Sequence, residues 1–432
     1  MPGRYYIETY GCALSEFDSS TMSSILDAQG YERVSDISDA DVVIVNTCAV
    51  RLDTERRIAL RLAEIRKITA RDGDGKKIIV AGCLAKARPG LITKIIPEAS
   101  IVSPQNVTRI LDVVESPERL VLLRGSRDTG WMPRLPITDS VATVMVSEGC
   151  LNDCSFCISK NARRELRSYR PRLIVETVRD LVSRGAREIR LTGLDVAAYG
   201  RDLPGRPSIA DLVSMILDKV DGDYRIRIGM MTPEQALEIL DDLITVYKDS
   251  RVFKFFHIPV QSGDDEVLRV MNRRYTVSDF KYIHSRIKNE FPDSMFATDI
   301  IVGHPGEDED AYMNTVRLVE ELRFERVHLA QYSIRPHTKS ASMKQIPDPV
   351  KKERSSKLMA IIERIGLEIH SKYLGGVYKA LVTEKSFRPG SMTARLDNYF
   401  PVVLPYRKSY IGRWVNVKIH DASFFDLKGI II

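Results

Sequence analysis

The sequence predicts an α/β protein with three parts: an N-terminal βαβ parallel-sheet domain, a central partial (βα)6 barrel and a small C-terminal β-barrel. Three observations support this prediction. Apolar strands alternate with helix-like stretches in residues 1–128, six further strand–helix units follow in residues 137–368, and short β-like runs fill residues 371–432. Alternating strands and helices are typical of parallel sheets, whereas successive short strands favour a sandwich or barrel.

In the first part, three apolar strands each run directly into a cysteine. These segments are Tyr5–Cys12, Val42–Cys48 and Ile78–Cys83. Helix-like stretches separate them, at Asp18–Gln29 and Asp53–Ala70. The carboxyl ends of neighbouring parallel strands line one crevice, where ligands bind. We therefore expect the three cysteines to lie together at one edge of the sheet.

The central part repeats the strand–helix pattern on a larger scale. Its expected strands are Thr143–Ser147, Glu188–Leu191, Arg225–Met230, Phe253–Pro259, Phe296–Val302 and Arg326–Tyr332. Amphipathic helices are expected between them, at Leu173–Arg184, Ile209–Val220, Pro233–Tyr247 and Ala311–Leu322. The proline-containing link Thr129–Asp139 marks the boundary with the first part. As in complete βα barrels, we expect the chemistry in the loops that follow the strands.

The last part follows a helix expected at Pro349–Tyr373. Its β-like runs are Val377–Thr383, Val402–Leu404 and Trp414–Ile419. From residue 371 onward the chain has ten Lys and Arg against four Asp and Glu, a surplus that equals the net charge of +6 of the whole chain. It also has ten aromatics, including Tyr399, Phe400, Tyr406, Tyr410 and Trp414. Basic and aromatic residues together suit phosphate contacts and base stacking, although the aromatics of a small β domain can also form its core.

The composition limits the class of protein. A length of 432 residues with 44% hydrophobic content predicts about three domains with buried cores. No apolar run approaches the roughly 20 residues that span a bilayer, and no signal-like segment opens the chain, so we expect a cytoplasmic protein without membrane contact. Six cysteines are too few for a disulfide scaffold of this size and are better explained as ligands or nucleophiles.

Three cysteines follow the first barrel strand with the spacing Cys150-x3-Cys154-x2-Cys157. A structural zinc ion would need a fourth ligand, and none lies nearby in the sequence. Three ligands would leave one iron of a 4Fe-4S cluster open, and S-adenosylmethionine (SAM) can bind such an iron by its amino and carboxylate groups. A zinc site or three incidental cysteines are the alternatives. Among the seven histidines, His257 lies in a strand, and we expect it to be structural.

The Cys150 spacing, with Phe156 just before the third cysteine, resembles the radical SAM superfamily. Within it, the N-terminal segments resemble the methylthiotransferases, whose first domain supplies three cysteines to an auxiliary cluster. The matching segments are Tyr10-Gly11-Cys12, Asn46-Thr47-Cys48-Ala49-Val50-Arg51 and Ala81-Gly82-Cys83-Leu84. The resemblance therefore implies two 4Fe-4S clusters, one on Cys150, Cys154 and Cys157 and the other on Cys12, Cys48 and Cys83.

Further motifs most resemble the archaeal and eukaryotic branch of the methylthiotransferases, which modifies threonylcarbamoyladenosine in tRNA. They are Ser147–Leu151, Leu191–Gly200 and His257–Gly263. The C-terminal part is similar to the TRAM domain, a small RNA-binding β-barrel. By this resemblance, Thr192, Gly193 and Asp195 should meet the SAM amino group, Gln261 and Ser262 should line its pocket, and Asp299–Glu307 should flank its adenine. The chain departs from the branch at Ser15, Leu194 and His304.

The resemblance implies addition of a methylthio group to threonylcarbamoyladenosine beside the anticodon. It implies two SAM molecules per turnover, a tRNA anticodon stem-loop as partner and an electron donor such as a flavodoxin or ferredoxin. No catalytic residue beyond the cluster ligands is required. The alternatives are methylthiolation of isopentenyladenosine in tRNA or of a ribosomal-protein aspartate, and a non-catalytic iron-sulfur protein that binds RNA.

Overall fold

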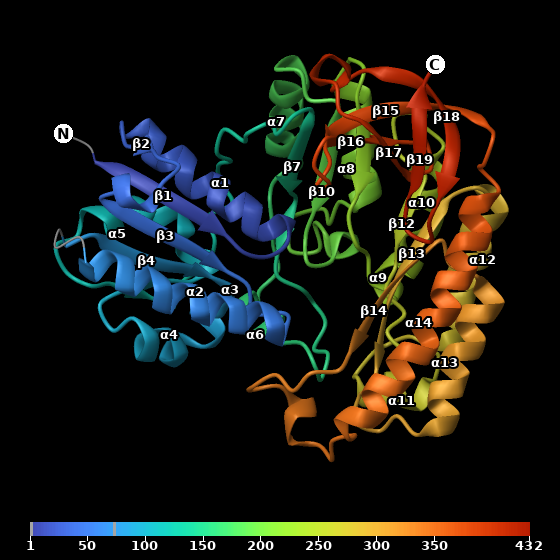
Figure 1. Cartoon of the computed structure of the whole chain (residues 1–432), viewed down its shortest axis with the longest axis horizontal. Helices are drawn as coiled ribbons and strands as arrows, with labels where there is room; N and C mark the ends of the chain where they lie inside the picture. Colours follow the sequence, from blue (N-terminus) through green and yellow to red (C-terminus); the bar gives the residue numbers. More distant parts are fainter. Residues whose placement is uncertain (1–2, 72–74) are drawn as a thin grey trace.

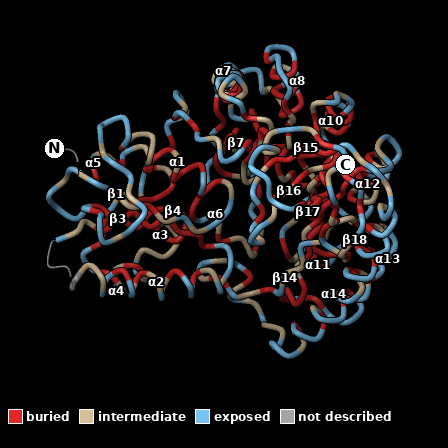
Figure 2. Tube along the Cα trace, turned by 45° about the horizontal axis from the view of Figure 1, so that its top comes forward, coloured by how far each residue is buried: buried red, intermediate tan, exposed pale blue. Residues whose placement is uncertain are grey.

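The computed structural model describes residues 3–71 and 75–432. Figure 1 shows a parallel-sheet domain at the N-terminal side, a larger domain of strands covered by helices, and a β-barrel formed by the C-terminal segment. Buried residues follow the strands of all three parts, and the exposed residues lie mainly on the outer faces of helices and in loops (Figure 2). No helix among the described residues combines the length and hydropathy needed to cross a membrane.

The N-terminal sheet has six strands in the order β2-β1-β3-β4-β5-β6, and all of its strand pairs are parallel. The strands are β1 (Arg4–Thr9), β2 (Glu32–Arg33), β3 (Val42–Thr47), β4 (Lys77–Gly82), β5 (Ser100–Val102) and β6 (Val121–Leu122). The sequence predicted β1, β3 and β4. It gave no sign of the other three, because runs of two or three residues have no periodicity to detect.

Five helices cover the two faces of this sheet. They are α1 (Ala13–Ala28), α2 (Leu52–Arg71), α3 (Cys83–Ala87), α4 (Pro89–Ile95) and α5 (Ile110–Glu115), and 3-10 turns lie at η1 (Ile37–Asp39) and η2 (Pro104–Arg109). Alternate strand residues face opposite ways. Val43 and Val45 of β3 therefore pack with α2, α3 and α4, whereas Ile44 packs with α1 and α5. Burial on both faces explains why these strands are continuously apolar.

The central domain is the expected open barrel of six parallel strands. Its strands form two sheets, β11-β10-β7 and β12-β13-β14, which a parallel bridge between Ile226 and Val252 joins. The strands are β7 (Val141–Met145), β10 (Glu188–Thr192), β11 (Arg225–Ile228), β12 (Phe255–His257), β13 (Met295–Val302) and β14 (Arg326–Gln331), with a small ribbon of β8 (Ser147–Glu148) and β9 (Arg167–Ser168).

The helices of the central domain pack on the outside of this barrel, except α6 (Ser159–Ala162), which packs against α3 of the N-terminal domain (Figure 1). They are α6 (Ser159–Ala162), α7 (Pro171–Ser183), α8 (Ile209–Lys219), α9 (Pro233–Glu238), α10 (Leu240–Tyr247), α11 (Asp265–Val270), α12 (Val277–Glu290) and α13 (Glu309–Leu322), with 3-10 turns η3 (Val196–Ala198) and η4 (Lys339–Ser342). The single helix predicted at Pro233–Tyr247 is two helices, because the backbone leaves helical geometry at Ile239 (φ −122°, ψ 18°). Helices α11 and α12 were not predicted.

The C-terminal segment follows α14 (Asp348–Ser371) and closes into a five-stranded barrel in the order β15-β16-β17-β19-β18. The strands are β15 (Val377–Lys385), β16 (Ser391–Arg395), β17 (Pro401–Pro405), β18 (Trp414–Ala422) and β19 (Leu427–Ile431), with a 3-10 turn η5 (Lys408–Tyr410). Its core is continuous with Phe253, Phe255 and Met295 of the central domain. The two barrels therefore share one apolar interface.

Candidate active site

The three N-terminal cysteines meet at the carboxyl edge of the sheet, as the strand pattern predicts. Cys12 follows β1, Cys48 follows β3 and Cys83 begins α3 directly after β4, and these three strands are neighbours. Cys12 is exposed, and the other two are buried. Gly11 allows the close approach: its φ is +136°, and an added Cβ would lie 3.2 Å from the Cβ of Cys48 and 2.4 Å from the Oγ of Ser15. A side chain at Gly11 would separate the cysteines.

The surroundings of this N-terminal trio set the charge on its thiols. Burial raises the pKa of the Cys83 thiol to about 11, while Arg163 acts in the opposite direction and donates from Nε to the Cys83 Sγ at 3.3 Å. Cys12 and Cys48 raise the Cys83 pKa further, because neighbouring thiolates repel one another. Burial likewise raises the pKa of Cys48. Three thiolates at this edge would need a bound cation to offset their repulsion.

The second trio lies on the loop between β8 and α6. Cys150, Cys154 and Cys157 are all half-buried. The amide of Asn152 donates to the Cys150 Sγ at 3.4 Å, and Arg273 Nη1 donates to the Cys154 Sγ at 3.0 Å. Burial raises the pKa of Cys150 to about 12, and Asp195 and the two other cysteines add to that shift. This loop therefore gathers three thiols with N–H donors aimed at two of the sulfurs.

The spacing of the sulfurs bears on the zinc alternative. Four thiolates about 2.3 Å from a tetrahedral zinc ion lie roughly 3.8 Å apart. Within residues 3–71 and 75–432, neither cysteine trio has all three sulfurs inside 4.8 Å of one another. Both trios are thus wider than a single tetrahedral zinc ion requires.

A cavity of about 530 Å³ lies between the two trios. Residues next to Cys48 form one side of it, and the Cys157 segment forms another. The lining residues are Val50, Arg51, Phe156, Cys157, Ile158, Ser159, His257, Gln261, Asp299, Ile300, Ile301, His328, Ala330, Gln331, Tyr332, Ser333 and Arg335. Cys157 is the one cysteine among the lining residues, and Val50 and Arg51 lie two and three residues after Cys48, so the cavity adjoins the second trio and the segment that carries Cys48.

Two of the residues expected around SAM line this cavity, and a third lies behind them. Phe156 is on the wall and packs edge-on against His304, with 6.0 Å between ring centroids. Gln261 is on the wall with φ +70°, and its backbone is held by hydrogen bonds to Asp299 and Ile301. Ser262 is fully buried beside Thr315. His304, one of the departures from the branch, thus packs its ring against the aromatic wall of the cavity.

The other three residues expected around SAM lie away from the cavity lining. Thr192 ends β10, and Gly193 approaches Ser147, whose Oγ would lie 3.1 Å from an added Cβ. Asp195 is fully buried and accepts hydrogen bonds from the amide and hydroxyl of Thr232. Burial raises the pKa of Asp195 to about 6. Its side chain therefore fixes this loop near Cys150.

A buried network of four charges that the sequence did not reveal joins the two cysteine sites. Asp18 of α1 and Glu148 of β8 each pair with both Arg127 and Arg163, and all four side chains are at most 1% exposed. Arg163 also donates to Cys83. The four charged residues are visible in the sequence, but their pairing depends on contacts between distant segments.

We expect Arg127→Met to destabilise the protein by about 3–5 kcal/mol, because two fully buried carboxylates would then share a single cation. Chemical denaturation of the anaerobically purified protein measures the effect. The matched control is Arg269→Met, which breaks an exposed pair with Glu266 and should leave the unfolding midpoint unchanged. Equal midpoints for the two variants would show that the network does not hold the domains together.

Three family models match the sequence in succession along the chain. Residues 4–103 match a model described as uncharacterized protein family UPF0004, residues 144–319 match the radical SAM superfamily, and residues 371–432 match the TRAM domain. The chain is 37% identical to a probable threonylcarbamoyladenosine tRNA methylthiotransferase from Pyrococcus horikoshii, over 99% of each chain. It is 32% identical to the threonylcarbamoyladenosine tRNA methylthiotransferase of Homo sapiens, over 99% of this chain and 74% of that protein.

A solved structure shares the fold at much lower identity. The radical SAM methyltransferase TsrM from Kitasatospora setae, with cobalamin and a 4Fe-4S cluster bound, matches with a TM-score of 0.56 and 12% identity. The match covers 91% of this chain and 81% of that one. This likeness supports the architecture of a sheet domain joined to an open βα barrel.

Proposed function

Because the chain belongs to the family of threonylcarbamoyladenosine tRNA methylthiotransferases, we propose that it adds a methylthio group to N6-threonylcarbamoyladenosine next to the anticodon of tRNA. It is a radical SAM transferase with iron-sulfur clusters and SAM as cofactors. The observation that carries the proposal is the cavity lined by Cys157 of one trio and by Val50 and Arg51, which follow Cys48 of the other trio in the chain. A reaction that takes its radical from one centre and its sulfur from another needs such a shared space.

We assign one 4Fe-4S cluster to Cys150, Cys154 and Cys157 and the other to Cys12, Cys48 and Cys83. When bound, the first would supply the electron that cleaves SAM, and the second would supply the sulfur that is transferred. Each trio has three thiols and no fourth, which suits a cluster with one iron open to a ligand. The N–H donors of Asn152, Arg273 and Arg163 stabilise the thiolates.

The chain's own residues position the substrates and exclude water. Phe156 and Gln261 are proposed to contact SAM from the cavity wall, with Ser262 behind Gln261. Thr192, Gly193 and Asp195 are proposed to shape the loop that meets its amino group. Two SAM molecules would be used per turnover, one as methyl donor and one as radical source, and a flavodoxin or ferredoxin would supply the electron. The protein's task is placement, because the cofactors carry the difficult chemistry.

The partner proposed for the C-terminal barrel is the tRNA anticodon stem-loop. The structure corrects part of the stacking expectation, because Tyr399 and Phe400 are buried in the barrel core. Trp414 packs under Arg225 and donates to Asp223, so it lies at the interface with the central domain. These three rings are not available to stack on bases.

A different patch, which we call the basic–aromatic patch, remains exposed. It consists of Lys385, Phe387, Arg388, Tyr406, Arg407 and Lys408. The amide of Tyr406 donates to the carbonyl of Gly390, which joins the loop after β17 to the turn between β15 and β16. Phe387 is 83% exposed, and the Lys385 ammonium lies 5.7 Å from the ring centroid of Tyr406. Arg388 is half-buried and pairs with Asp426, whereas Lys385, Arg407 and Lys408 are exposed and form no ion pair within the described residues. Exposed rings among such cations fit a nucleic-acid surface.

We expect the triple substitution of Lys385, Arg407 and Lys408 by Gln to weaken tRNA binding and to flatten its salt dependence. Removing three phosphate contacts should reduce the slope of log K against log salt by about 2 to 3. Filter binding over a range of salt concentrations measures both quantities. Deleting the whole barrel would be a poorer test, because it would uncover Phe253 and Phe255.

The matched control replaces Arg57, Lys67 and Lys94 by Gln. These residues are exposed on α2 and α4 of the N-terminal domain and form no ion pair within the described residues. It removes the same number and kind of charges elsewhere. The assignment to the C-terminal patch is wrong if both triple variants lower the slope equally.

The activity is tested by anaerobic reaction of the reconstituted protein with SAM, a reductant and tRNA carrying threonylcarbamoyladenosine, followed by mass analysis of the nucleosides. The proposal predicts a methylthio derivative of threonylcarbamoyladenosine. Product only on isopentenyladenosine, or only on a ribosomal-protein aspartate, would replace this proposal with one of the two sister activities. Absence of any SAM cleavage would point to a non-catalytic iron-sulfur protein.

A further inference from the structure

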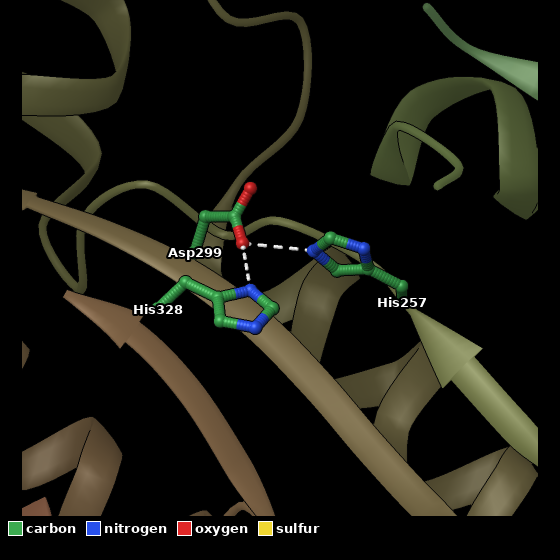
Figure 3. Close-up of side chains that lie close together, drawn as sticks. All are labelled: His257, Asp299 and His328. Carbon is green, nitrogen blue, oxygen red and sulfur yellow. Dashed lines mark hydrogen bonds and ion pairs between the residues drawn. The ribbon is translucent and has the colours of Figure 1, made fainter. Parts of the chain in front are cut away.

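Three polar side chains meet on the interior wall of the open barrel, on neighbouring strands (Figure 3). His257 ends β12, Asp299 lies in β13 and His328 lies in β14. The Nε2 of His257 and the Nδ1 of His328 each lie 2.8 Å from the same oxygen, Oδ1 of Asp299. All three side chains line the cavity between the cysteine trios. The resemblance places the segment Asp299–Glu307 beside the adenine of SAM, but it gives no role to the side chains of His257 and His328.

The geometry is that of one carboxylate braced by two imidazoles. A neutral imidazole donates from one ring nitrogen only, so these contacts fix the tautomer of each ring. Burial by itself would raise the pKa of Asp299, but hydrogen bonds from His257 and His328 outweigh it and hold that pKa well below its usual range. Asp299 is therefore an anion whose position is set from two sides.

The bracing leaves several acceptor atoms free on the cavity side. Oδ2 of Asp299 makes no hydrogen bond within the described part of the chain, and Figure 3 shows it directed away from both rings. The second nitrogens, Nδ1 of His257 and Nε2 of His328, likewise have no partner there. A wall of this kind accepts hydrogen bonds, so it is complementary to a ligand that carries N–H or O–H groups.

A metal ion is a weaker explanation for this trio. The carboxylate Oδ1 lies at hydrogen-bond length from both ring nitrogens, so each contacting nitrogen carries a proton, whereas a metal ligand must present a lone pair. Ligands of a tetrahedral ion with bonds of about 2.1 Å would also lie further apart than 2.8 Å, at roughly 3.4 Å. In the observed arrangement the three side chains bond to one another, and their remaining acceptor atoms face the cavity.

We propose that Asp299, braced by His257 and His328, is the group that recognises the substrate base, with its free oxygen accepting the N–H on N6 of the adenine. The inference rests on the proposed function. An N6-substituted adenine keeps one such hydrogen beside the ring to be modified. Phe156 and Gln261 line the cavity on the proposed SAM side, Val50 lines it on the side of Cys48, and the trio lies on the same lining, within reach of a base held there. Asp299 contacts the substrate, and the two histidines are positioning residues.

The test is Asp299→Asn, which keeps the shape of the side chain and removes the negative charge. The expected result is a change in the ratio of the two products, because this contact places the base and does not supply the radical. Methylthiolated product should fall about 10- to 100-fold, the effect of losing a hydrogen bond to a charged group. The number of deoxyadenosine molecules formed per methylthiolated nucleoside should rise by the same factor. A merely structural change would lower both products together.

The matched control is Asp218→Asn on the outer face of α8, where Asp218 is exposed and makes no hydrogen bond within the described residues. This variant should keep the wild-type ratio of the two products. Wild-type protein in the same assay keeps the two proposals distinguishable. If the wild type forms no methylthio nucleoside, the proposed function fails. If the wild type forms it, the product ratio of Asp299→Asn tests the role of Asp299.

Conservative substitutions of the two histidines test whether their hydrogen bonds to Asp299, rather than their size, hold its side chain in place. Gln at position 257 can donate where His257 Nε2 does, and Asn at position 328 can donate where His328 Nδ1 does. We expect His257→Gln and His328→Asn to keep the product ratio near wild type, and His257→Leu and His328→Leu to shift it about tenfold or more toward deoxyadenosine. Equal product ratios in the Leu variants and in the Gln and Asn variants would show that these hydrogen bonds do not position Asp299.

Two results would overturn the role of Asp299. One is a product ratio within twofold of wild type in Asp299→Asn. The other is a non-cluster metal ion bound at one per chain in the wild type and absent from Asp299→Asn, which would make the trio a cation site.

Discussion

Replacing Cys154 by alanine should abolish the formation of deoxyadenosine from SAM while the protein keeps its fold. The Cys150 loop would keep only two thiols, and two thiolates cannot hold the cluster that three hold. Loss of an outer partner of a metal ligand already costs 10- to 100-fold in affinity or activity, so loss of a ligand should cost at least about 100-fold. Anaerobic incubation with SAM and a strong reductant, followed by quantification of deoxyadenosine, measures the effect.

The fold of this variant should survive for a local reason. Cys154 is half-buried on a loop, and its sulfur receives a single side-chain hydrogen bond, from Arg273. Alanine there removes a sulfur without opening the core of the barrel. Retention of deoxyadenosine formation in Cys154→Ala would remove Cys150, Cys154 and Cys157 from the radical chemistry altogether.

Replacing Cys48 by alanine should have the opposite pattern. SAM cleavage should continue within about twofold of wild type, whereas the methylthio product should fall by at least about 100-fold. Cys48 belongs to the N-terminal sheet, and its trio shares no residue with the loop that would hold SAM. The two cysteine variants thus serve as controls for each other, with deoxyadenosine and methylthio nucleoside measured in the same reactions.

The account is contradicted if Cys154→Ala and Cys48→Ala have the same effect on both products. Loss of both products in both variants would mean that the two sites are one functional unit. Since the buried network of Asp18, Arg127, Glu148 and Arg163 joins the two sites, the Cys48 variant should also be checked for an unchanged unfolding midpoint.

The sequence was a good guide where the signal is local. A strand that ends in a cysteine is visible in the sequence, and parallel pairing of β1, β3 and β4 brings Cys12, Cys48 and Cys83 to one edge. The second trio lies on one short loop, so its proximity needed no tertiary argument. The six barrel strands were also predictable, because each is a short run in which apolar residues are continuous or alternate with polar ones, as in RIRI of β11.

What the sequence could not show depends on contacts between distant segments. Nothing near His257 in the chain indicates that Asp299 and His328 lie beside it, because the three come from separate strands. The burial of Tyr399 and Phe400 was equally inaccessible, since an aromatic residue in a small barrel serves its core or its surface depending on register. Strands β16 and β19 were missed because their side-chain alternation is short and interrupted by polar residues.

The central claim is that two separate groups of three cysteines hold one cluster each. Iron counting with Mössbauer spectroscopy on anaerobically reconstituted protein tests it most directly, using the wild type and two triple Cys→Ala variants. We predict about eight irons per chain in the wild type and about four in each variant, all in 4Fe-4S clusters. A triple variant that keeps all its iron, or that loses all of it, would contradict the assignment of two independent sites.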